Sequence, residues 1–307
     1  GVGSLTRALL EYPPSIIKRI IAIETHPPFL AQLSALARTD PRLHVLPASP
    51  YLWETYDELM SSSLLSDITP VPWEEEQTQL QFICRLPLTL ISEQLMSQFL
   101  RFVPLKAWLF KYGRVPMGFL LPLGLWERLS APTEVENRCK LSVITALTTH
   151  AHLSSPISLL QPYNSHFLPL PSAEDTRLAL ASPARAARDV RSPNKGKHIG
   201  HPYVAASFLP LREQHIPPSG LDTWDYITRM LFVQRSTAVK EGITNLGLGA
   251  KSLLKYLDFD TQMTPRQLRA REWTQVVDAF EDWPFRPNIY AVMEEGGDGH
   301  STRRNLD

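Results

Sequence analysis

Two glycines and one acidic residue near the start of the chain have the spacing of a nucleotide-binding turn. The chain begins GVGSLT, so Gly1 and Gly3 stand directly before an apolar helical pattern. A Gly-x-Gly turn lets the backbone approach a ligand closely, and the helix that follows turns its positive end toward that ligand. Glu24 ends the next expected strand, where a carboxylate can accept hydrogen bonds from ribose hydroxyls. An ordinary tight turn also explains the glycines, and Glu24 is the residue that favours nucleotide binding.

The elements that would position these residues follow from the spacing of apolar side chains. Short apolar runs predict strands, and apolar residues three or four apart predict helices. Because the two patterns alternate, the sequence favours an α/β domain with a largely parallel sheet. The expected helices cover residues 5–10, 29–36, 95–102 and 134–150, and the expected strands cover residues 20–23, 43–46, 80–84, 108–110 and 203–211.

The rest of the chain changes composition twice. Residues 174–198 combine Arg and Lys with Ala, Ser and Pro, which is typical of a mobile basic insertion. After the expected linker 215–220 the periodicity is helical only. Two stripes are expected to face a helical core: Met230, Val233 and Thr237, and Trp273, Val276, Val277 and Phe280. We expect a first domain over 1–214, a helical domain over 221–290 and a flexible tail over 291–307.

Composition narrows the classes of function. The chain of 307 residues has 31 basic and 31 acidic side chains, so its bulk charge does not indicate a nucleic-acid binder, although a local patch remains open. Its two cysteines, Cys84 and Cys139, make a disulfide framework unexpected and favour a reducing compartment. No metal site is expected, because neither cysteine has a second Cys or a His at ligand spacing. No apolar run has the length of a membrane span, so no membrane partner is expected.

An ordered set of motifs resembles the rRNA adenine N6-dimethyltransferases. GVGSLT and IAIE resemble the family's first two motifs, and ICRLPLTLIS (83–92) occupies the place of its Asn-Leu-Pro-Tyr motif. HFLPLPS (166–172) resembles its Phe-x-Pro-x-Pro stretch. The resemblance continues through ENRCKLSVITAL (136–147), YVAASFLPL (203–211) and LFVQRSTAVKEGITNLG (231–247). It covers nearly the whole chain in the correct order.

The resemblance implies a fold and a cofactor. The fold would be a Rossmann-like domain with a seven-stranded mixed sheet, followed by a small all-helical domain. The strand that should precede Gly1 is absent from this sequence, so we expect a fragment. The cofactor would be S-adenosylmethionine, contacted at positions matching Gly1, Gly3, Glu24, Ser49 and Arg85.

Departures at the catalytic motif are as informative as the matches. The motif falls on Arg85, Leu86, Pro87 and Leu88. In the family, Asn and a backbone carbonyl accept the target amino group, and Tyr stacks on the flipped adenine. Arg85 carries only donors, and its positive charge opposes a sulfonium cofactor. Leu88 offers no aromatic platform, and neutral Ser49 stands in the place of a cofactor-binding Asp. We therefore expect an outline of the cofactor pocket without its chemistry, and no confident catalytic residue.

Two further stretches resemble a subgroup, the fungal mitochondrial transcription factors derived from these enzymes. They are LKAWLFKYGRVPMGFLLPLGLWERL (105–129) and MTPRQLRAREWTQVVDAFEDWPFRP (263–287). The resemblance implies a location in the mitochondrial matrix and two partners, the single-subunit mitochondrial RNA polymerase and melted promoter DNA. Candidate nucleic-acid contacts are Arg85, Lys111, Arg114, Arg185, Arg188 and Arg191. The alternative is an active rRNA adenine N6-dimethyltransferase, whose partner would be rRNA. Solvated or structural roles remain open for each of these cations.

Overall fold

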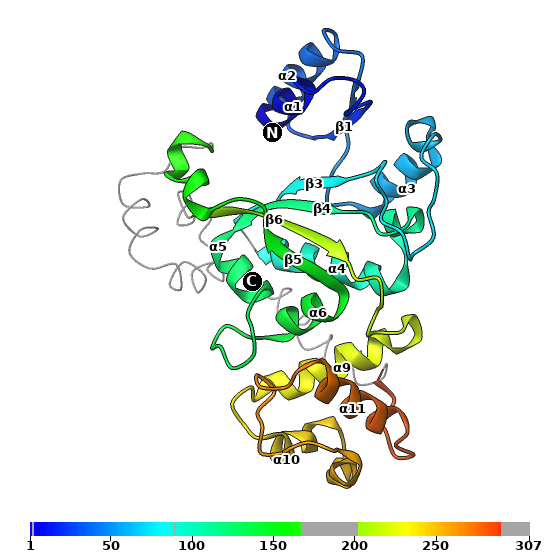
Figure 1. Ribbon diagram of the computed structural model, residues 1–307, viewed down its shortest axis with the longest axis vertical. Coiled ribbons are helices and arrows are strands. Elements are labelled where there is room, and N and C mark those ends of the chain that lie inside the picture. The colour runs from blue at the N-terminus through cyan, green and yellow to red at the C-terminus, as the bar shows by residue number, and fades with distance from the viewer. Residues whose placement is uncertain (2, 89, 168–201, 290–307) are drawn as a thin grey trace, which may run out of the picture. The chain divides into compact units, whose positions relative to one another are not determined.

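A computed structural model of the chain describes residues 1, 3–88, 90–167 and 202–289 (Figure 1). The chain divides into two compact units, Gly1–Pro70 and Val71–Asp307. We describe each unit by itself. None of the described helices is long and apolar enough to cross a membrane.

The first unit contains a parallel pair of strands. Strands β1 (Ile20–Ile23) and β2 (Leu43–Leu46) pair in register, with Ile20 opposite Leu43. Its helices are α1 (Ser4–Leu10), α2 (Pro27–Ala37) and α3 (Trp53–Ser61). The strands predicted at 20–23 and 43–46 are confirmed to the residue. A helix between two parallel strands is the connection that such pairing requires.

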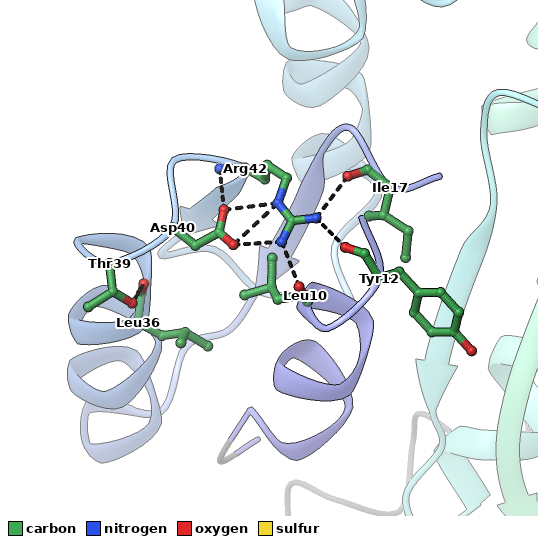
Figure 2. Close-up of polar contacts among 7 residues, drawn as sticks. All are labelled: Leu10, Tyr12, Ile17, Leu36, Thr39, Asp40 and Arg42. Carbon is green, nitrogen blue, oxygen red and sulfur yellow. Dashed lines mark hydrogen bonds and ion pairs between the residues drawn. The ribbon is translucent and has the colours of Figure 1, made fainter. Parts of the chain in front are cut away.

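Arg42 joins the separate segments of the first unit (Figure 2). Its guanidinium forms an ion pair with Asp40, with Nη2 at 2.7 Å from Oδ2. The same group donates to the carbonyl oxygens of Leu10 at 2.6 Å, Tyr12 at 2.7 Å and Ile17 at 3.2 Å. Carbonyls at a helix end need partners outside the helix. Arg42 therefore fixes the end of α1, and the loop after it, against the start of β2.

The second unit is built on a four-stranded mixed sheet in the order β3-β4-β6-β5. β3 and β4 are parallel, whereas β6 is antiparallel to both β4 and β5. The strands are β3 (Phe82–Arg85), β4 (Met117–Pro122), β5 (Thr149–Leu153) and β6 (Tyr203–Pro210). Helices α4 (Leu90–Leu105), α5 (Leu123–Leu129) and α6 (Lys140–Thr148) accompany them. A mixed sheet with helices is confirmed.

The strand predicted at 108–110 is wrong. Residues Trp108–Tyr112 form a 3₁₀ helix, and Trp108 has a φ of 54°, which no strand residue adopts. The side chains of Trp108, Leu109 and Phe110 are nevertheless buried. The Trp108 ring packs against Phe82, the first residue of β3, with the ring centroids 4.9 Å apart. The strand that follows α4 is β4, which begins at Met117, nine residues after Trp108.

The helix predicted over 134–150 is shorter than expected. It begins at Lys140, after Cys139 and Ser142 form a capping box, and it ends at Thr148, where the edge strand β5 begins. Seven of its nine residues are buried, so it is enclosed on nearly all sides, as expected for a helix without a polar face.

The C-terminal helices belong to the same compact unit as the sheet. They are α9 (Leu221–Val233), α10 (Val239–Gly242) and α11 (Ala270–Glu281), with 3₁₀ turns at Ile243–Leu246 and Ala250–Tyr256. Helix α6 contacts β5 on one side and α9 and α11 on the other (Figure 1). The all-helical character of this part follows the prediction.

One of the two predicted stripes faces the core. Trp273, Val276, Val277 and Phe280 are all buried. The stripe of Met230, Val233 and Thr237 is wrong, because Val233 is 71 % exposed and α9 ends there. The buried face of α9 instead includes Trp224, Ile227 and Leu231, which follow the same helical period from a different starting residue.

Candidate functional site

In the first unit, Glu24 lies directly after β1, as the motif requires. Its Oε1 accepts hydrogen bonds from the backbone N–H groups of Thr25 and His26, at 2.8 Å each, and Oε2 contacts the Gly1 amine. The carboxylate is therefore ionised near neutral pH and held in one orientation.

The glycine turn has the backbone that a close approach needs. Gly3 has a φ of 85°, and a Cβ there would lie 3.1 Å from Leu33 Cδ2. Around Gly1, nothing lies within 4 Å of such a Cβ. Ser49 accepts a hydrogen bond from the Tyr51 N–H through its Oγ, at 3.3 Å. Glu24 Oε1 and Ser49 Oγ thus each accept hydrogen bonds from the backbone that follows them.

In the second unit, the backbone of the catalytic-motif positions is fixed at three points. The Leu86 N–H donates to the Leu120 carbonyl at 2.8 Å, which extends the pairing of β3 with β4. The Leu86 carbonyl accepts from Tyr203 Oη at 2.9 Å, and the Pro87 carbonyl accepts from the buried Ser92 hydroxyl. The Leu86 and Pro87 carbonyls therefore each have one of their two acceptor positions occupied within the protein.

Arg85 ends β3 and lies among aromatic rings. Its guanidinium carbon is 5.2 Å from the ring centroids of both Phe167 and Tyr203. Its Nη2 donates to Tyr163 Oη at 3.3 Å. Both ring distances are within the range of cation–π attraction, worth about 0.5–1 kcal/mol for an exposed group. Arg85 remains exposed although the rings are buried, so the rings orient a charge that solvent still reaches.

Leu88 packs against the same three rings. Tyr163, Phe167 and Tyr203 form one buried cluster, and Leu88, Leu120 and Leu160 cover it. We call Arg85 and these three aromatic residues the arginine box. The aromatic surface that Leu88 cannot supply is present, but it belongs to residues far along the chain, and the cation occupies it.

Sequence reasoning named Arg85 and missed the role of its partners. Tyr163 and Tyr203 lie 78 and 118 residues beyond it, and the sequence alone does not bring them together. The resemblance to a Phe-x-Pro-x-Pro stretch included Phe167 and was the one available signal. Residues 168–172 of that stretch lie outside the described residues.

The other candidate cations have different surroundings. Lys111 is exposed in the 3₁₀ turn Trp108–Tyr112. Arg114 donates to three backbone carbonyls: Trp73 at 2.9 Å, Pro210 at 3.1 Å and Glu74 at 3.4 Å. This geometry supports a structural role for Arg114. The candidates Arg185, Arg188 and Arg191 lie outside the described residues, as do the basic segment 174–198 and the tail 291–307.

Comparison with known proteins gives relatives of two kinds. The chain is 28% identical to mitochondrial transcription factor 1 of Lachancea kluyveri over 252 residues, 78% of this chain and 67% of the relative. It is 26% identical to the protein of that name from Saccharomyces paradoxus, over 94% of this chain and 80% of the relative. It is also 21% identical to a mitochondrial dimethyladenosine transferase 1 of Vermamoeba vermiformis, over 94% of this chain and 82% of the relative. These relatives confirm the expected mitochondrial location.

A solved structure and a family model confirm the fold and the resemblance. A dimethyladenosine transferase from Plasmodium falciparum superposes with a TM-score of 0.54 at 13% identity, covering 92% of this chain and 87% of that one. This likeness confirms the Rossmann-like fold. The ribosomal RNA adenine dimethylase model matches residues 1–282. The chain therefore belongs to the ribosomal RNA adenine dimethylase family.

Proposed function

We propose that this chain is a mitochondrial transcription initiation factor that binds the mitochondrial RNA polymerase and holds melted promoter DNA. The observation that carries the proposal is the arginine box, in which Arg85 stands at the motif position and is backed by Phe167 and Tyr203. Relatives named mitochondrial transcription factor 1 support it.

The motif loop is poorly suited to methyl transfer to an adenine amino group. S-adenosylmethionine, when bound, supplies the methyl group, and the protein must supply acceptors that position the amine. Arg85 has only donors. The Leu86 and Pro87 carbonyls already accept hydrogen bonds from Tyr203 and Ser92. A target amine would meet the donors of Arg85 and two carbonyls that each have one acceptor position already occupied.

The same loop is suited to a single nucleic-acid strand. Within the described part of the chain, the Arg85 guanidinium gives one hydrogen bond, to Tyr163. Its other donors bond none of the described residues and in this proposal contact a phosphate or a base edge, and a planar guanidinium also stacks on bases. Because the formal net charge of the chain is zero, affinity for DNA must come from local cations. Lys111 and the basic stretch 174–198 are further candidates for these contacts.

Promoter-dependent transcription tests the proposal directly. Purified mitochondrial RNA polymerase is supplied with a linear duplex promoter or with the same promoter already mismatched around the start site, each with and without the full-length protein. We expect strong stimulation on the duplex and a much smaller effect on the mismatched template, because the factor stabilises melted DNA. Equal transcription with and without the protein on the duplex would refute the proposal.

The alternative is an active rRNA adenine N6-dimethyltransferase, which family membership and the dimethyladenosine transferase relatives support. An rRNA methylation assay with the full-length protein separates the two, and calorimetric titration of S-adenosylmethionine shows whether the cofactor is available to it. The proposal expects no methylation of rRNA, whether or not Glu24 and the glycines still bind the nucleoside. Micromolar cofactor binding together with methyl transfer to rRNA adenine would establish the alternative.

A further inference from the structure

Two of the most exposed apolar side chains of the second unit lie on segments that touch each other. Leu248 is 99 % exposed and Phe285 is 78 % exposed. A Cβ on Gly247 would lie 3.2 Å from Pro287 Cδ and 3.5 Å from Trp283 Cζ3, so the loop around Leu248 packs against the segment that carries Phe285. The two segments therefore form one contiguous surface, which we call the Leu248 surface and define as residues 247–256 and 283–287.

The exposure of Leu248 is built into the backbone. Gly247 and Gly249, on either side, have φ angles of 145° and 86°. Residues other than glycine rarely adopt such φ angles, so the loop has a defined conformation that requires both glycines. Leu246 and Ala250, the next residues outward, are almost completely buried. Leu248 is thus presented to solvent by a loop anchored at both ends.

The charge of the Leu248 surface has one sign. Its two segments contain Lys251, Lys255 and Arg286, and no Asp or Glu. All three cations are exposed, and Arg286 also donates to the Glu281 carbonyl at 2.7 Å. Large exposed apolar side chains within a charged rim mark sites of protein interaction. The complementary partner is a segment that has apolar side chains flanked by carboxylates.

We propose that the Leu248 surface docks an acidic, apolar segment of the mitochondrial RNA polymerase; this inference rests on the proposed function and gives that partner a site. Leu248 and Phe285 enter apolar pockets of the polymerase, and the three cations meet carboxylates at the rim. A phosphate backbone is the less suitable occupant, because it would pair with the cations and leave both apolar side chains in water.

The test compares three variants of the full-length protein for affinity to the purified polymerase without DNA. L248S/F285S removes the apolar anchors, and K251E/K255E reverses the rim charge. V233S is the control, at an apolar residue that is 71 % exposed and lies outside this surface. We expect about tenfold weaker binding for each double variant, as is typical of anchor residues, and wild-type binding for V233S. Added salt should weaken wild-type binding more than K251E/K255E binding.

Each outcome has a separate meaning. Thermal melting at the wild-type temperature shows that the variants are folded, which is expected because all substituted side chains are exposed. If the wild-type protein does not bind the polymerase, both the proposed function and this inference fail. If the wild type binds the polymerase and L248S/F285S binds it equally well, docking at the Leu248 surface is refuted, whereas the proposed function is not. Retained polymerase binding with lost affinity for promoter DNA would assign the surface to nucleic acid and refute the inference.

Discussion

Arg138 donates a hydrogen bond to the backbone carbonyl of Leu268, 130 residues further along the chain, at 3.0 Å. A second donor of the same guanidinium bonds the Ala131 carbonyl, also at 3.0 Å. Arg138 is 5 % exposed, and burial lowers its pKa. One buried cation thus joins the loop before α6 to the loop before α11.

Replacing Arg138 should destabilise the second unit strongly. R138M keeps the length of the side chain but leaves two buried carbonyls without partners, and each such group costs about 1–3 kcal/mol. We expect the free energy of unfolding to fall by about 2–4 kcal/mol, measured by urea denaturation. R271M is the control, because Arg271 forms an exposed ion pair with Asp258 and should be near neutral. Equal effects of the two substitutions would show that burial of Arg138 is irrelevant.

The Asp40–Arg42 pair should make the stability of the first unit depend on pH at its acidic end. The side chain of Arg42 holds the pKa of Asp40 below its unfolded value of 3.8. A lowered folded pKa means that this stability is fully present above the unfolded pKa and is lost as the pH falls through the folded pKa. D40N should therefore lower the melting temperature at about pH 7, and the difference from wild type should shrink as the pH falls below 3.8. A difference that stays constant with pH would contradict this role.

Cys84 should be almost inert toward alkylating reagents in the folded protein. Burial raises the pKa of its thiol to about 12, so at pH 8 it reacts about a thousandfold more slowly than an ordinary thiol. Mass spectrometry of iodoacetamide-treated protein measures this rate, with a short cysteine peptide as the reference and urea-unfolded protein as the positive control. Labelling of Cys84 at the peptide's rate would show that the thiol is open to solvent.

Arg85 should contribute both a charge and a stacking plane to the binding of single-stranded DNA. R85A removes one phosphate contact, so the slope of log affinity against log salt should become about 0.7 shallower. R85K keeps the charge and the slope, but its ammonium group cannot lie flat over the rings of Phe167 and Tyr203, so its affinity should fall severalfold. Fluorescence anisotropy at several salt concentrations measures both quantities. An unchanged slope for R85A would exclude a phosphate contact.

The sequence predicted most accurately the short strands whose residues are mostly apolar. The run at 20–23 is apolar and the run at 43–46 is apolar except for His44, and they form β1 and β2 as expected. β4 could not be found in this way, because Gly118 lies within it and Pro116 precedes it, and both residues are typical of turns. The apolar residues 108–110 predicted a strand because burial alone does not distinguish a strand from a turn.

Within the candidate site, only the residues that belong to a short sequence motif could be predicted. Arg85 and Leu88 could be named because they replace two residues of one short pattern. Tyr163 and Tyr203 could not, since their role depends on β6 lying beside β4 and on the chain after β5 returning to the end of β3. Such long-range juxtaposition is a property of the sheet order and leaves no local trace in the sequence.

Helix α6, enclosed between the sheet and the C-terminal helices, has a consequence for how this protein can be divided. Its buried Leu, Val, Ile and Thr side chains contribute to both layers at once. A shortened chain that ends after β6 would expose to solvent the side of α6 that faces α9 and α11. We therefore expect this shortened chain to aggregate. The sheet and the helices after it are therefore expected to melt together, in a single calorimetric transition.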